Sequence, residues 1–449
     1  MRIAIVGTGY VGLTTGVCLA SMGHEMSCVD IVPERVTAIN NRKVPFYEPG
    51  LAEMLSKVVA SRRLYATTDL VEAITRSEVT FITVGTPQSD QGIDLSYIAT
   101  AARQIGYALR HVSDYHLVVL KSTVVPGTTD TLVRNLLEEG SGLQAGEFGL
   151  CMNPEFLREG SAIHDFMNPD RIVIGQWDER SGQTLGEVYK PFDCPRIFTT
   201  LRNAEMIKYA ANALLATLVS FSNEIAALCE VTPDTDINVV MQGVHLDRRL
   251  SPVINGEQIK PGILNFLWAG CGFGGSCLPK DVNALRAYAR ERAITPYLLD
   301  AVMTINSKRP AILEKLAEEA LGSLRGAVIA VLGLAFKPGT DDLRESPALT
   351  VIKLLLDKGA IVKAYDPFVA SIPPELGFDN LATLCNTPEE VLRDSDTAIV
   401  VTAYPEFAEW DWTTLCNSMR RQIIIDGRNI LRKVSWPKKV RYMGIGQVN

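Results

Sequence analysis

The sequence has few cysteines, no excess of positive charge and no long apolar run. Nine cysteines scattered over 449 residues exclude a disulfide-stabilised secreted scaffold and fit a reducing compartment. Acidic residues outnumber basic ones by 51 to 44, and the net charge of −7 argues against a nucleic-acid-binding protein. The longest apolar stretch, about Tyr209 to Phe221, is too short to cross a bilayer, and the first residues lack the apolar core of a secretory signal. We therefore expect a cytoplasmic protein that binds neither membranes nor nucleic acids.

Short apolar runs alternate with helical patterns in the first third of the chain. The expected strands are Arg2–Val6, Glu25–Asp30, Val79–Val84, Leu117–Leu120 and Gly149–Met152. The helical patterns between them are Val11–Met22, Pro33–Asn41, Ser96–Leu109 and Thr128–Glu138. This order predicts βαβ units and a parallel sheet covered on both faces. The same alternation restarts at Gly326, with a glycine turn at Gly333 but no second G-x-G-x-x-G.

The middle of the chain has a helical pattern. Residues 203 to 230 contain neither proline nor glycine and predict one long helix, and a further helical segment is expected from Thr295 to Leu321. The expected fold class is α/β: two doubly wound, Rossmann-like parallel-sheet domains joined by a helical domain with a long spine helix. The expected domain ranges are 1–200, 201–322 and 323–449.

The first strand runs into the pattern G-x-G-x-x-G at Gly7, Gly9 and Gly12. In a dinucleotide site these glycines permit a tight turn, a close approach of the pyrophosphate and close packing of helix on strand. Asp30, 23 residues after Gly7, is placed to accept the ribose hydroxyls and would repel a 2′-phosphate. Arg35 could instead accept that phosphate. The pattern favours NAD over NADP.

A glycine-rich loop from Gly270 to Asp281 contains a candidate nucleophile. Four glycines in six positions allow the backbone to approach a ligand, and Pro279 can begin a helix. Cys277 would then lie near a helix N-terminus beside Lys280, two influences that lower a thiol pKa. A buried, inert cysteine is the alternative. Since no second cysteine pair is near, we expect no metal site.

Several other polar residues are candidates for functional roles because of their positions in the predicted helices and strands. Lys208 and Asn212, four residues apart on the long helix, could together hold a developing oxyanion, or simply form a solvated face. Glu155 and Glu159 follow a predicted strand and could supply a general base. Thr86 and Thr123 also follow strands, where they would line the nicotinamide side or cap turns.

At this point the motifs resemble the UDP-glucose/GDP-mannose dehydrogenase family over nearly the whole chain. The matching segments are Gly-Thr-Gly-Tyr-Val-Gly at 7–12, Tyr-Glu-Pro-Gly-Leu at 47–51, Ser-Thr-Val-Val-Pro-Gly-Thr at 122–128, Asn-Pro-Glu-Phe-Leu-Arg-Glu-Gly at 153–160, Ala-Glu-Met-Ile-Lys-Tyr-Ala-Ala-Asn at 204–212, Gly-Gly-Ser-Cys-Leu-Pro-Lys-Asp at 274–281, Phe-Lys at 336–337 and Arg-Glu-Ser-Pro at 344–347. Unrelated motifs in one order are far more specific than any single motif.

The resemblance implies an NAD-dependent four-electron oxidation of a nucleotide sugar's C6 alcohol to a carboxylate through a thioester on the cysteine. The implied catalytic residues are Cys277, Lys208, Asn212, Glu155, Asp281 and Thr123. The cofactor contacts expected from motif and resemblance are Gly7, Gly9, Val11, Gly12, Asp30, Arg35, Thr86, Thr123, Glu159, Lys280 and Arg344. The implied substrate contacts are Glu155, Phe156, Leu157, Arg158, Glu159, Lys208, Asn212, Phe266, Leu267, Trp268, Ala269, Gly270, Gly274, Phe336, Lys337 and Arg428. A homodimer or higher homo-oligomer is expected.

Some residues depart from the family pattern. An element that usually precedes the substrate loop is matched only by Asp247–Pro252, and an apparent insertion follows from Val253 to Leu264. Leu278 is the residue typical of GDP-mannose members. UDP-glucose is the favoured substrate, with GDP-mannose or another nucleotide sugar as alternatives. The rival functions are a non-catalytic sensor of NAD and nucleotide sugar, a two-electron hydroxy-acid dehydrogenase and a decarboxylating nucleotide-sugar enzyme.

Overall fold

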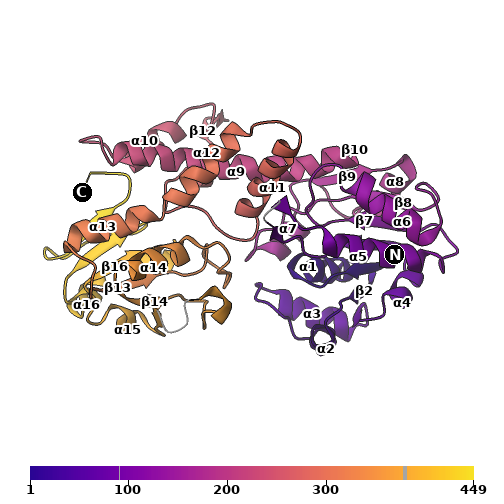
Figure 1. Cartoon of the computed structure of the whole chain (residues 1–449), viewed down its shortest axis with the longest axis horizontal. Helices are drawn as coiled ribbons and strands as arrows, with labels where there is room; N and C mark the ends of the chain where they lie inside the picture. Colours follow the sequence, from indigo (N-terminus) through magenta and orange to yellow (C-terminus); the bar gives the residue numbers. More distant parts are fainter. Residues whose placement is uncertain (90–91, 378–381, 449) are drawn as a thin grey trace. The chain divides into compact units, whose positions relative to one another are not determined.

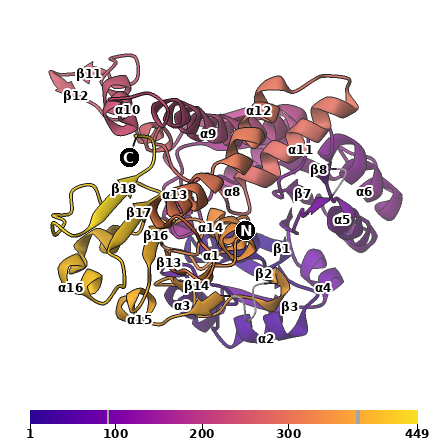
Figure 2. The ribbon, with the colours of Figure 1, turned by 60° about the vertical axis from the view of Figure 1, so that its left-hand side comes forward.

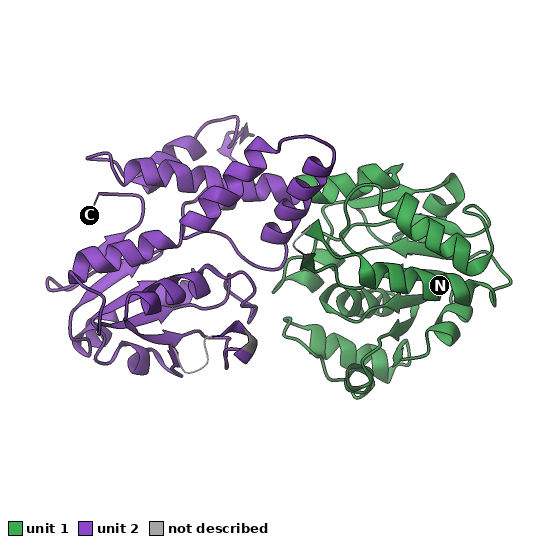
Figure 3. Ribbon diagram, in the orientation of Figure 1, with its two compact units in different colours: residues 1–211 green, residues 212–449 purple. Residues whose placement is uncertain are grey.

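The computed structural model describes residues 1–89, 92–377 and 382–448. It separates into two compact units, Met1–Ala211 and Asn212–Asn449, which Figure 3 colours differently. Helix α9 (Leu201–Cys229) contributes to both, because the division falls within it. Each unit contains one large sheet with helices packed against it (Figure 1). The α/β class predicted from the sequence is confirmed.

The first unit is built around an eight-stranded sheet. Its strands are β1 (Arg2–Val6), β2 (Glu25–Val29), β3 (Leu64–Thr67), β4 (Val79–Ile82), β7 (Leu117–Leu120), β8 (Gly149–Met152), β9 (Ile172–Gln176) and β10 (Arg196–Thr200). They lie in the order β10-β9-β8-β7-β4-β1-β2-β3. All neighbours pair in parallel except β8 and β9, so β9 and β10 run opposite to the other six strands. A separate two-stranded pair is formed by β5 (Gln88–Ser89) and β6 (Gly92–Ile93).

Helices cover both faces of this sheet. They are α1 (Tyr10–Ser21), α2 (Pro33–Asn40), α3 (Leu51–Ala60), α4 (Leu70–Thr75), α5 (Ser96–Leu109), the π-helix η1 (Thr129–Val133), α6 (Arg134–Ser141), α7 (Ala162–Met167) and α8 (Glu179–Val188). Because successive side chains of a strand point to opposite faces of the sheet, one strand contributes side chains to two cores. Leu117 and Val119 of β7 pack in the core that contains α1, whereas Val118 and Leu120 pack in the core that contains α5.

The second unit contains a wholly parallel six-stranded sheet. Its strands are β13 (Val328–Leu332), β14 (Ile361–Tyr365), β15 (Ala382–Leu384), β16 (Thr397–Val400), β17 (Ile423–Asp426) and β18 (Arg441–Gly444), in the order β15-β14-β13-β16-β17-β18. The associated helices are α13 (Ala311–Leu321), α14 (Pro347–Asp357), η3 (Pro374–Leu376), α15 (Pro388–Leu392), η4 (Pro405–Glu409) and α16 (Trp412–Asn417). Figure 2 shows β16, β17 and β18 side by side.

The second unit contains further helical elements. They are the end of α9, then α10 (Ile237–His245), η2 (Gly262–Phe266), α11 (Leu278–Glu291) and α12 (Tyr297–Lys308). The helical segment expected from Thr295 to Leu321 consists of two helices, α12 and α13, because Pro310 cannot continue the backbone ladder. The insertion forms a small hairpin, β11 (Val253–Ile254) and β12 (Glu257–Gln258), beside α10 (Figures 1 and 2).

Helix α9 is long and apolar enough to cross a membrane by length and composition alone. Its side chains instead pack in the cores of the protein: Leu201 and Ala204 in the first unit, Ala226 and Cys229 in the second. It also carries two charged side chains that are buried among protein groups, Glu205 and Lys208. We therefore describe α9 as the spine helix that the sequence predicts.

Candidate functional site

The glycine loop after β1 has the geometry of a dinucleotide site. Gly7 has φ +98° and donates its N–H to the carbonyl of Val29 on the neighbouring strand at 2.8 Å. A Cβ at Gly12 would lie 1.9 Å from the Gly7 carbonyl oxygen, so only glycine permits this packing of α1 on the turn. Gly9 faces open space within 4 Å, which leaves room for a pyrophosphate at the start of the helix.

Asp30 lies directly after β2 and is held in place by the loop. Its Oδ2 accepts hydrogen bonds from the Thr8 backbone at 2.9 Å and from Arg35 at 3.0 Å, and its Oδ1 accepts one from Val32 N–H at 3.0 Å. Burial alone would raise the pKa of Asp30, but these hydrogen bonds outweigh it and lower the pKa. The carboxylate is therefore charged and held in a fixed position beside the glycine loop.

A cleft of about 1110 Å³ opens beside this loop. It is lined by residues that follow β1, β2 and β4 and by helix α5, among them Gly7, Gly9, Asp30, Arg35, Thr83, Tyr97, Arg103, Gln104 and Tyr107. The residues of α5 were not predicted, because exposed side chains on a helix carry no motif. Thr86 and Thr123 are both buried, and neither is among the lining residues. The cleft therefore joins the glycine loop, the charged Asp30 and helix α5.

We expect NAD+ to be used at least roughly 100-fold more efficiently than NADP+. Two unit charges about 4 Å apart repel by about 4 kcal/mol at an effective dielectric constant of about 20, and Arg35 offsets part of this. Asp30→Asn keeps the hydrogen bonds from Thr8 and should reduce the preference for NAD+ over NADP+, whereas Arg35→Ala should increase that preference. Steady-state kcat/KM with both cofactors checks this; equal efficiency in the unsubstituted enzyme would contradict it.

Glu155 and Lys208 form a buried ion pair in the first unit. Their Oε1 and Nζ atoms lie 2.8 Å apart, and both side chains are more than nine-tenths buried. Oε2 of Glu155 accepts the Leu157 N–H at 2.7 Å. Burial would raise the pKa of Glu155, but Lys208, the Leu157 N–H and the more distant Lys121 together lower it. The structure thus brings together two residues that are 53 apart in the sequence.

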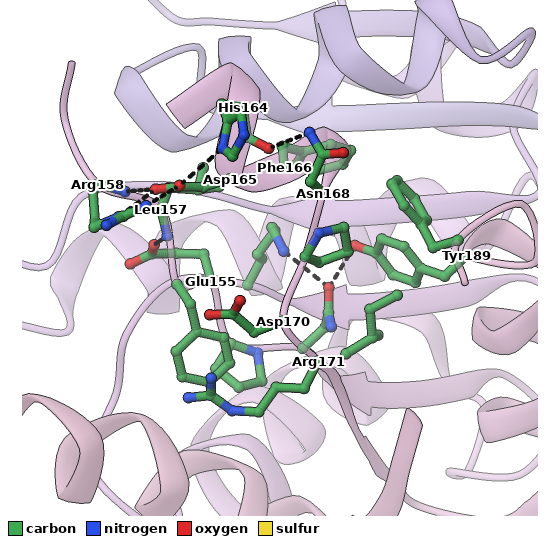
Figure 4. Close-up of a pocket in the computed structure, with 17 residues that line it drawn as sticks. Glu155, Leu157, Arg158, His164, Asp165, Phe166, Asn168, Asp170, Arg171 and Tyr189 are labelled. Carbon is green, nitrogen blue, oxygen red and sulfur yellow. Dashed lines mark hydrogen bonds and ion pairs between the residues drawn. The ribbon is translucent and has the colours of Figure 1, made fainter. Parts of the chain in front are cut away.

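A cavity of about 120 Å³ lies next to Glu155 (Figure 4). Glu155, Phe156, Leu157 and Arg158 line it, as the motif predicts, together with Lys121, Asn153, Asp165, Arg171 and Tyr189, which the sequence analysis missed. Arg158 makes a two-pronged ion pair with Asp165, with N–O distances of 2.6 and 2.9 Å. The loop that carries Glu155 is also tied down by Glu48, which accepts the N–H groups of Gly160 and Ala162 at 2.7 Å.

The cysteine loop leads into α11 in the second unit. Cys277 is the N-cap residue of α11 and is partly exposed, and Pro279 lies in the first turn. Asp281 is fully buried and accepts hydrogen bonds from Asn212 Nδ2 at 2.6 Å and from Lys280 Nζ at 2.7 Å. Three of the predicted residues therefore meet at one carboxylate, and Cys277 precedes it by one helical turn.

Residues of the C-terminal sheet domain pack against this loop. Gly275 donates to the Arg344 carbonyl at 2.9 Å, and a Cβ at Gly275 would meet the Phe336 ring at 2.7 Å. A Cβ at Gly274 would lie 2.1 Å from the Glu345 carbonyl oxygen. Lys337 Nζ lies 5.4 Å from the centre of the Phe336 ring. Gly274 and Gly275 are thus needed for close packing of the loop on Glu345 and Phe336.

The segment from Phe266 to Gly270 is anchored by polar groups that the sequence analysis missed. The Gly270 N–H binds Asn223 Oδ1 at 2.8 Å, and its carbonyl accepts Arg309 Nε at 2.9 Å. Arg428 Nη1 would lie 2.5 Å from a Cβ at Gly270. Leu267 and Ala269 are buried, whereas the Trp268 ring packs edge-on against the His245 ring, with 4.5 Å between the ring centres. The signal that could have indicated the first anchor is an asparagine, Asn223, inside the largely apolar helix α9, whereas Arg309 follows the end of α12 and carries no such signal.

The second sheet domain lacks the G-x-G-x-x-G pattern of the first, although its turn at Gly333 is built in a similar way. Asp366 follows β14 as Asp30 follows β2, and its Oδ2 accepts the N–H groups of Leu334 and Ala335 at 2.7 and 3.0 Å. Its Oδ1 accepts those of Phe368 and Val369 at 2.8 and 3.2 Å. The Asp366 carboxylate therefore holds together the loops that follow β13 and β14.

Three profiles of the UDP-glucose/GDP-mannose dehydrogenase family match the chain. The NAD binding domain matches residues 1–193, the central domain residues 202–308 and the UDP binding domain residues 330–433. The first match confirms the prediction that the cofactor is NAD.

Full-length relatives agree with these profiles. The UDP-glucose 6-dehydrogenase TuaD of Bacillus subtilis is 41% identical over 431 residues, which cover 96% of this chain and 89% of that protein. The UDP-glucose 6-dehydrogenase of Rhizobium meliloti is 40% identical over 462 residues and covers 100% of both. A UDP-glucose dehydrogenase structure from Pyrobaculum islandicum has 37% identity and a TM-score of 0.88 over 99% of this chain and 97% of that chain. With its motifs, its fold and these matches in agreement, the chain belongs to the UDP-glucose/GDP-mannose dehydrogenase family.

Proposed function

We propose that the chain oxidises the C6 alcohol of UDP-glucose to the carboxylate of UDP-glucuronate, with consumption of one water. The glycine loop would hold NAD+, which would supply the hydride acceptor for each of the two oxidations. The observation that supports this most strongly is the similarity to UDP-glucose 6-dehydrogenases at about 40% identity over nearly the full chain. The buried pair of Glu155 and Lys208 and the cysteine at the start of α11 fit the chemistry.

We assign the ranges 1–200, 201–322 and 323–449 to an NAD-binding domain, a helical domain with the cysteine loop, and a UDP-binding domain. The proposed cofactor contacts are Gly7, Gly9, Val11, Gly12, Asp30, Arg35, Thr86, Thr123, Glu159, Lys280 and Arg344. The proposed sugar-nucleotide contacts are the residues 155–159, Lys208, Asn212, the residues 266–270, Gly274, Phe336, Lys337 and Arg428. Arg428 and Lys337 would supply positive charge to the diphosphate.

In this proposal Lys208 and Asn212 stabilise charge on the C6 oxygen. A lysine ammonium and an amide N–H are the donors that a developing alkoxide or tetrahedral oxyanion needs. Lys208 is 3% exposed, so its charge acts in a medium of low dielectric constant. Asn212 is oriented by Asp281 at 2.6 Å, which fixes the direction of its amide group.

Cys277 makes the second oxidation feasible. The aldehyde formed first has no hydride that can leave until a nucleophile adds to its carbonyl carbon. Addition of the Cys277 thiolate gives a thiohemiacetal, and loss of the remaining C6 hydride from it gives a thioester. The N-cap position of Cys277 favours the thiolate through the helix dipole.

Glu155 is the proposed general base for hydrolysis of the thioester, and Asp281 and Thr123 help to order the attacking water. Glu155 takes one proton from the water while the oxygen adds to the acyl carbon, and the Cys277 thiolate leaves. The lowered pKa of Glu155 keeps it ionised for this role at neutral pH.

Glu155→Gln should slow hydrolysis far more than either hydride step, because glutamine cannot accept the proton. A covalent adduct on Cys277 should then accumulate after NADH release, and intact-protein mass spectrometry after one turnover detects it. The same change at the exposed Glu53, which pairs with Lys57 at 2.6 Å, is the control and should leave turnover unchanged. Turnover without any adduct in Glu155→Gln would remove Glu155 from this role.

The proposal includes a cytoplasmic homodimer or higher homo-oligomer that forms through α9. Leu214, Phe221 and Leu228 are spaced seven residues apart on α9 and are 52, 45 and 58% exposed. Residues seven apart lie on one side of a helix, so these three form an exposed apolar stripe. The aromatic ring of Phe221, at the centre of the stripe, offers the largest apolar surface for burial against a second copy.

The experiment that tests the proposed function is NADH formation with a panel of UDP-, GDP- and dTDP-sugars. UDP-glucose should give the highest kcat/KM and two NADH per sugar. A preference for GDP-mannose, which Leu278 would fit, would change the assigned substrate and leave the assigned reaction unchanged. One NADH per sugar would indicate a two-electron dehydrogenase, release of carbon dioxide a decarboxylating enzyme, and binding without turnover a sensor.

A further inference from the structure

Lys121 is a buried lysine that the proposed chemistry does not use. It follows β7 directly, and the residue is 4% exposed. Its Nζ donates to Asn153 Oδ1 at 2.9 Å and lies 6.0 Å from the centre of the Tyr189 ring. Among the residues that the structure describes, no carboxylate lies within ion-pair distance of this ammonium, although a buried charge is costly without a partner.

Lys121 and Glu155 line the same 120 Å³ cavity. Asn153, which binds Lys121, is two residues before Glu155 and is itself fixed by Tyr189 Oη at 2.6 Å and by the Val173 carbonyl at 2.8 Å. The acceptor of Lys121 is therefore a rigid, neutral amide. The buried charge of opposite sign that acts on Lys121 is Glu155.

Other charged groups around the cavity are already balanced or exposed. Arg158 pairs with Asp165 at 2.6 Å, and the exposed His164 lies 3.7 Å from the same aspartate. Asp170 is exposed, and the Arg171 guanidinium lies 4.0 Å from the centre of the Phe156 ring. The buried charges next to Glu155 are thus two lysines: Lys208 in contact, and Lys121 beyond it.

We propose that Lys121 is a positioning residue for Glu155. Lys121 supplies a second, fixed positive charge that keeps Glu155 ionised while Lys208 stabilises the charge on the C6 oxygen. This inference rests on the proposed function, in which the Lys208 ammonium stabilises charge on the C6 oxygen. Glu155 would then lose its 2.8 Å partner while still buried, and burial favours the protonated acid. A protonated Glu155 cannot accept the proton of water.

The lysine's own ionisation agrees with this role. Burial lowers the pKa of Lys121 to about 8, with Glu155 raising it and Lys208 lowering it. Lys121 is consequently charged at neutral pH. Removing its charge should raise the pKa of Glu155, so the acid limb of uronate formation should move to higher pH.

The experiment compares Lys121→Gln, Lys121→Arg and Tyr189→Phe by the pH profile of uronate release. Lys121→Gln keeps a donor for Asn153 but removes the charge, and its acid limb should move up by about one pH unit, about a tenfold loss at acidic pH. Lys121→Arg should keep the original limb. Tyr189→Phe removes the second hydrogen bond to Asn153 Oδ1 without a change of charge and should not move the limb.

A lower rate with an unshifted limb in Lys121→Gln, or an equal shift in Tyr189→Phe, would overturn the proposal in favour of a structural role. A second measurement does not need turnover: the ¹³C resonance of the Glu155 carboxyl, assigned by its loss in Glu155→Gln. In the unsubstituted protein it should show an inflection as Lys121 loses its proton, at a pH below the ordinary range of a lysine. Its absence would overturn the proposal even if a Lys121 variant does not fold. If UDP-glucose is not oxidised but the inflection is present, the proposed function is wrong and the Lys121–Glu155 coupling stands.

Discussion

Replacing Cys277 with serine should lower the rate of uronate formation by at least about 10³-fold, the scale seen when an enzyme loses its nucleophile. A serine hydroxyl at neutral pH is a far poorer nucleophile than a thiolate, and an alkoxide is a far poorer leaving group. The first hydride transfer needs no covalent bond to the protein. Slow formation of the aldehyde, or an ester stalled on the serine, should therefore remain.

The matched control is the same substitution at Cys271 in the same loop. Cys271 is fully buried, its Sγ donates to the Val401 carbonyl at 3.4 Å, and burial raises the pKa of its thiol. A serine there can keep that hydrogen bond, so Cys271→Ser should retain uronate formation with two NADH per sugar. Near-normal acid production by Cys277→Ser would contradict the thioester mechanism.

Lys208→Ala should depress both hydride steps, each by about 10²- to 10³-fold, the usual effect of removing a group that stabilises a developing oxyanion. Both steps pass through negative charge on the C6 oxygen. The substitution also leaves Glu155 buried without its partner, which should raise the pKa of that carboxyl. Rapid-mixing measurements of NADH formation, started once from UDP-glucose and once from the 6-aldehyde, separate the two steps.

Lys190→Ala is the control for this lysine. Lys190 is exposed and pairs with Glu187 at 3.0 Å, so its loss should change neither step. If Lys208→Ala slowed only the step that starts from UDP-glucose, the residue would act on the alcohol alone and not on both oxyanions.

Much of the fold follows from local pattern. Apolar runs such as Leu117–Leu120 are strands as predicted, because both faces of a parallel strand are buried. Strand β10 was not predicted: its residues are largely exposed and alternate too weakly to signal a strand. The reversed direction of β9 leaves no trace in the sequence, since strand direction depends on how connections cross the sheet.

The site could be predicted only where a local motif carries the chemistry. Gly7 and Gly12 signal the nucleotide loop, because their spacing is a backbone requirement. The contact of Lys208 with Glu155 joins residues 53 apart, and no spacing rule reaches that far. Lys121 was not predicted, although a lysine at the end of the run Val118–Leu120 is a charge at the border of a buried strand. The role proposed for Lys121 depends on its hydrogen bond to Asn153, and only the fold brings Lys121 Nζ within 2.9 Å of Asn153 Oδ1.

The ratio of NADH formed to UDP-glucose consumed by the unsubstituted enzyme at completion distinguishes a four-electron from a two-electron oxidation. Absorbance gives the NADH, and chromatography of the nucleotide sugars gives the substrate lost and the product formed. A four-electron oxidation predicts two NADH for each UDP-glucose, with UDP-glucuronate as the only accumulating sugar product. One NADH for each UDP-glucose, with a product other than the uronate, would contradict it.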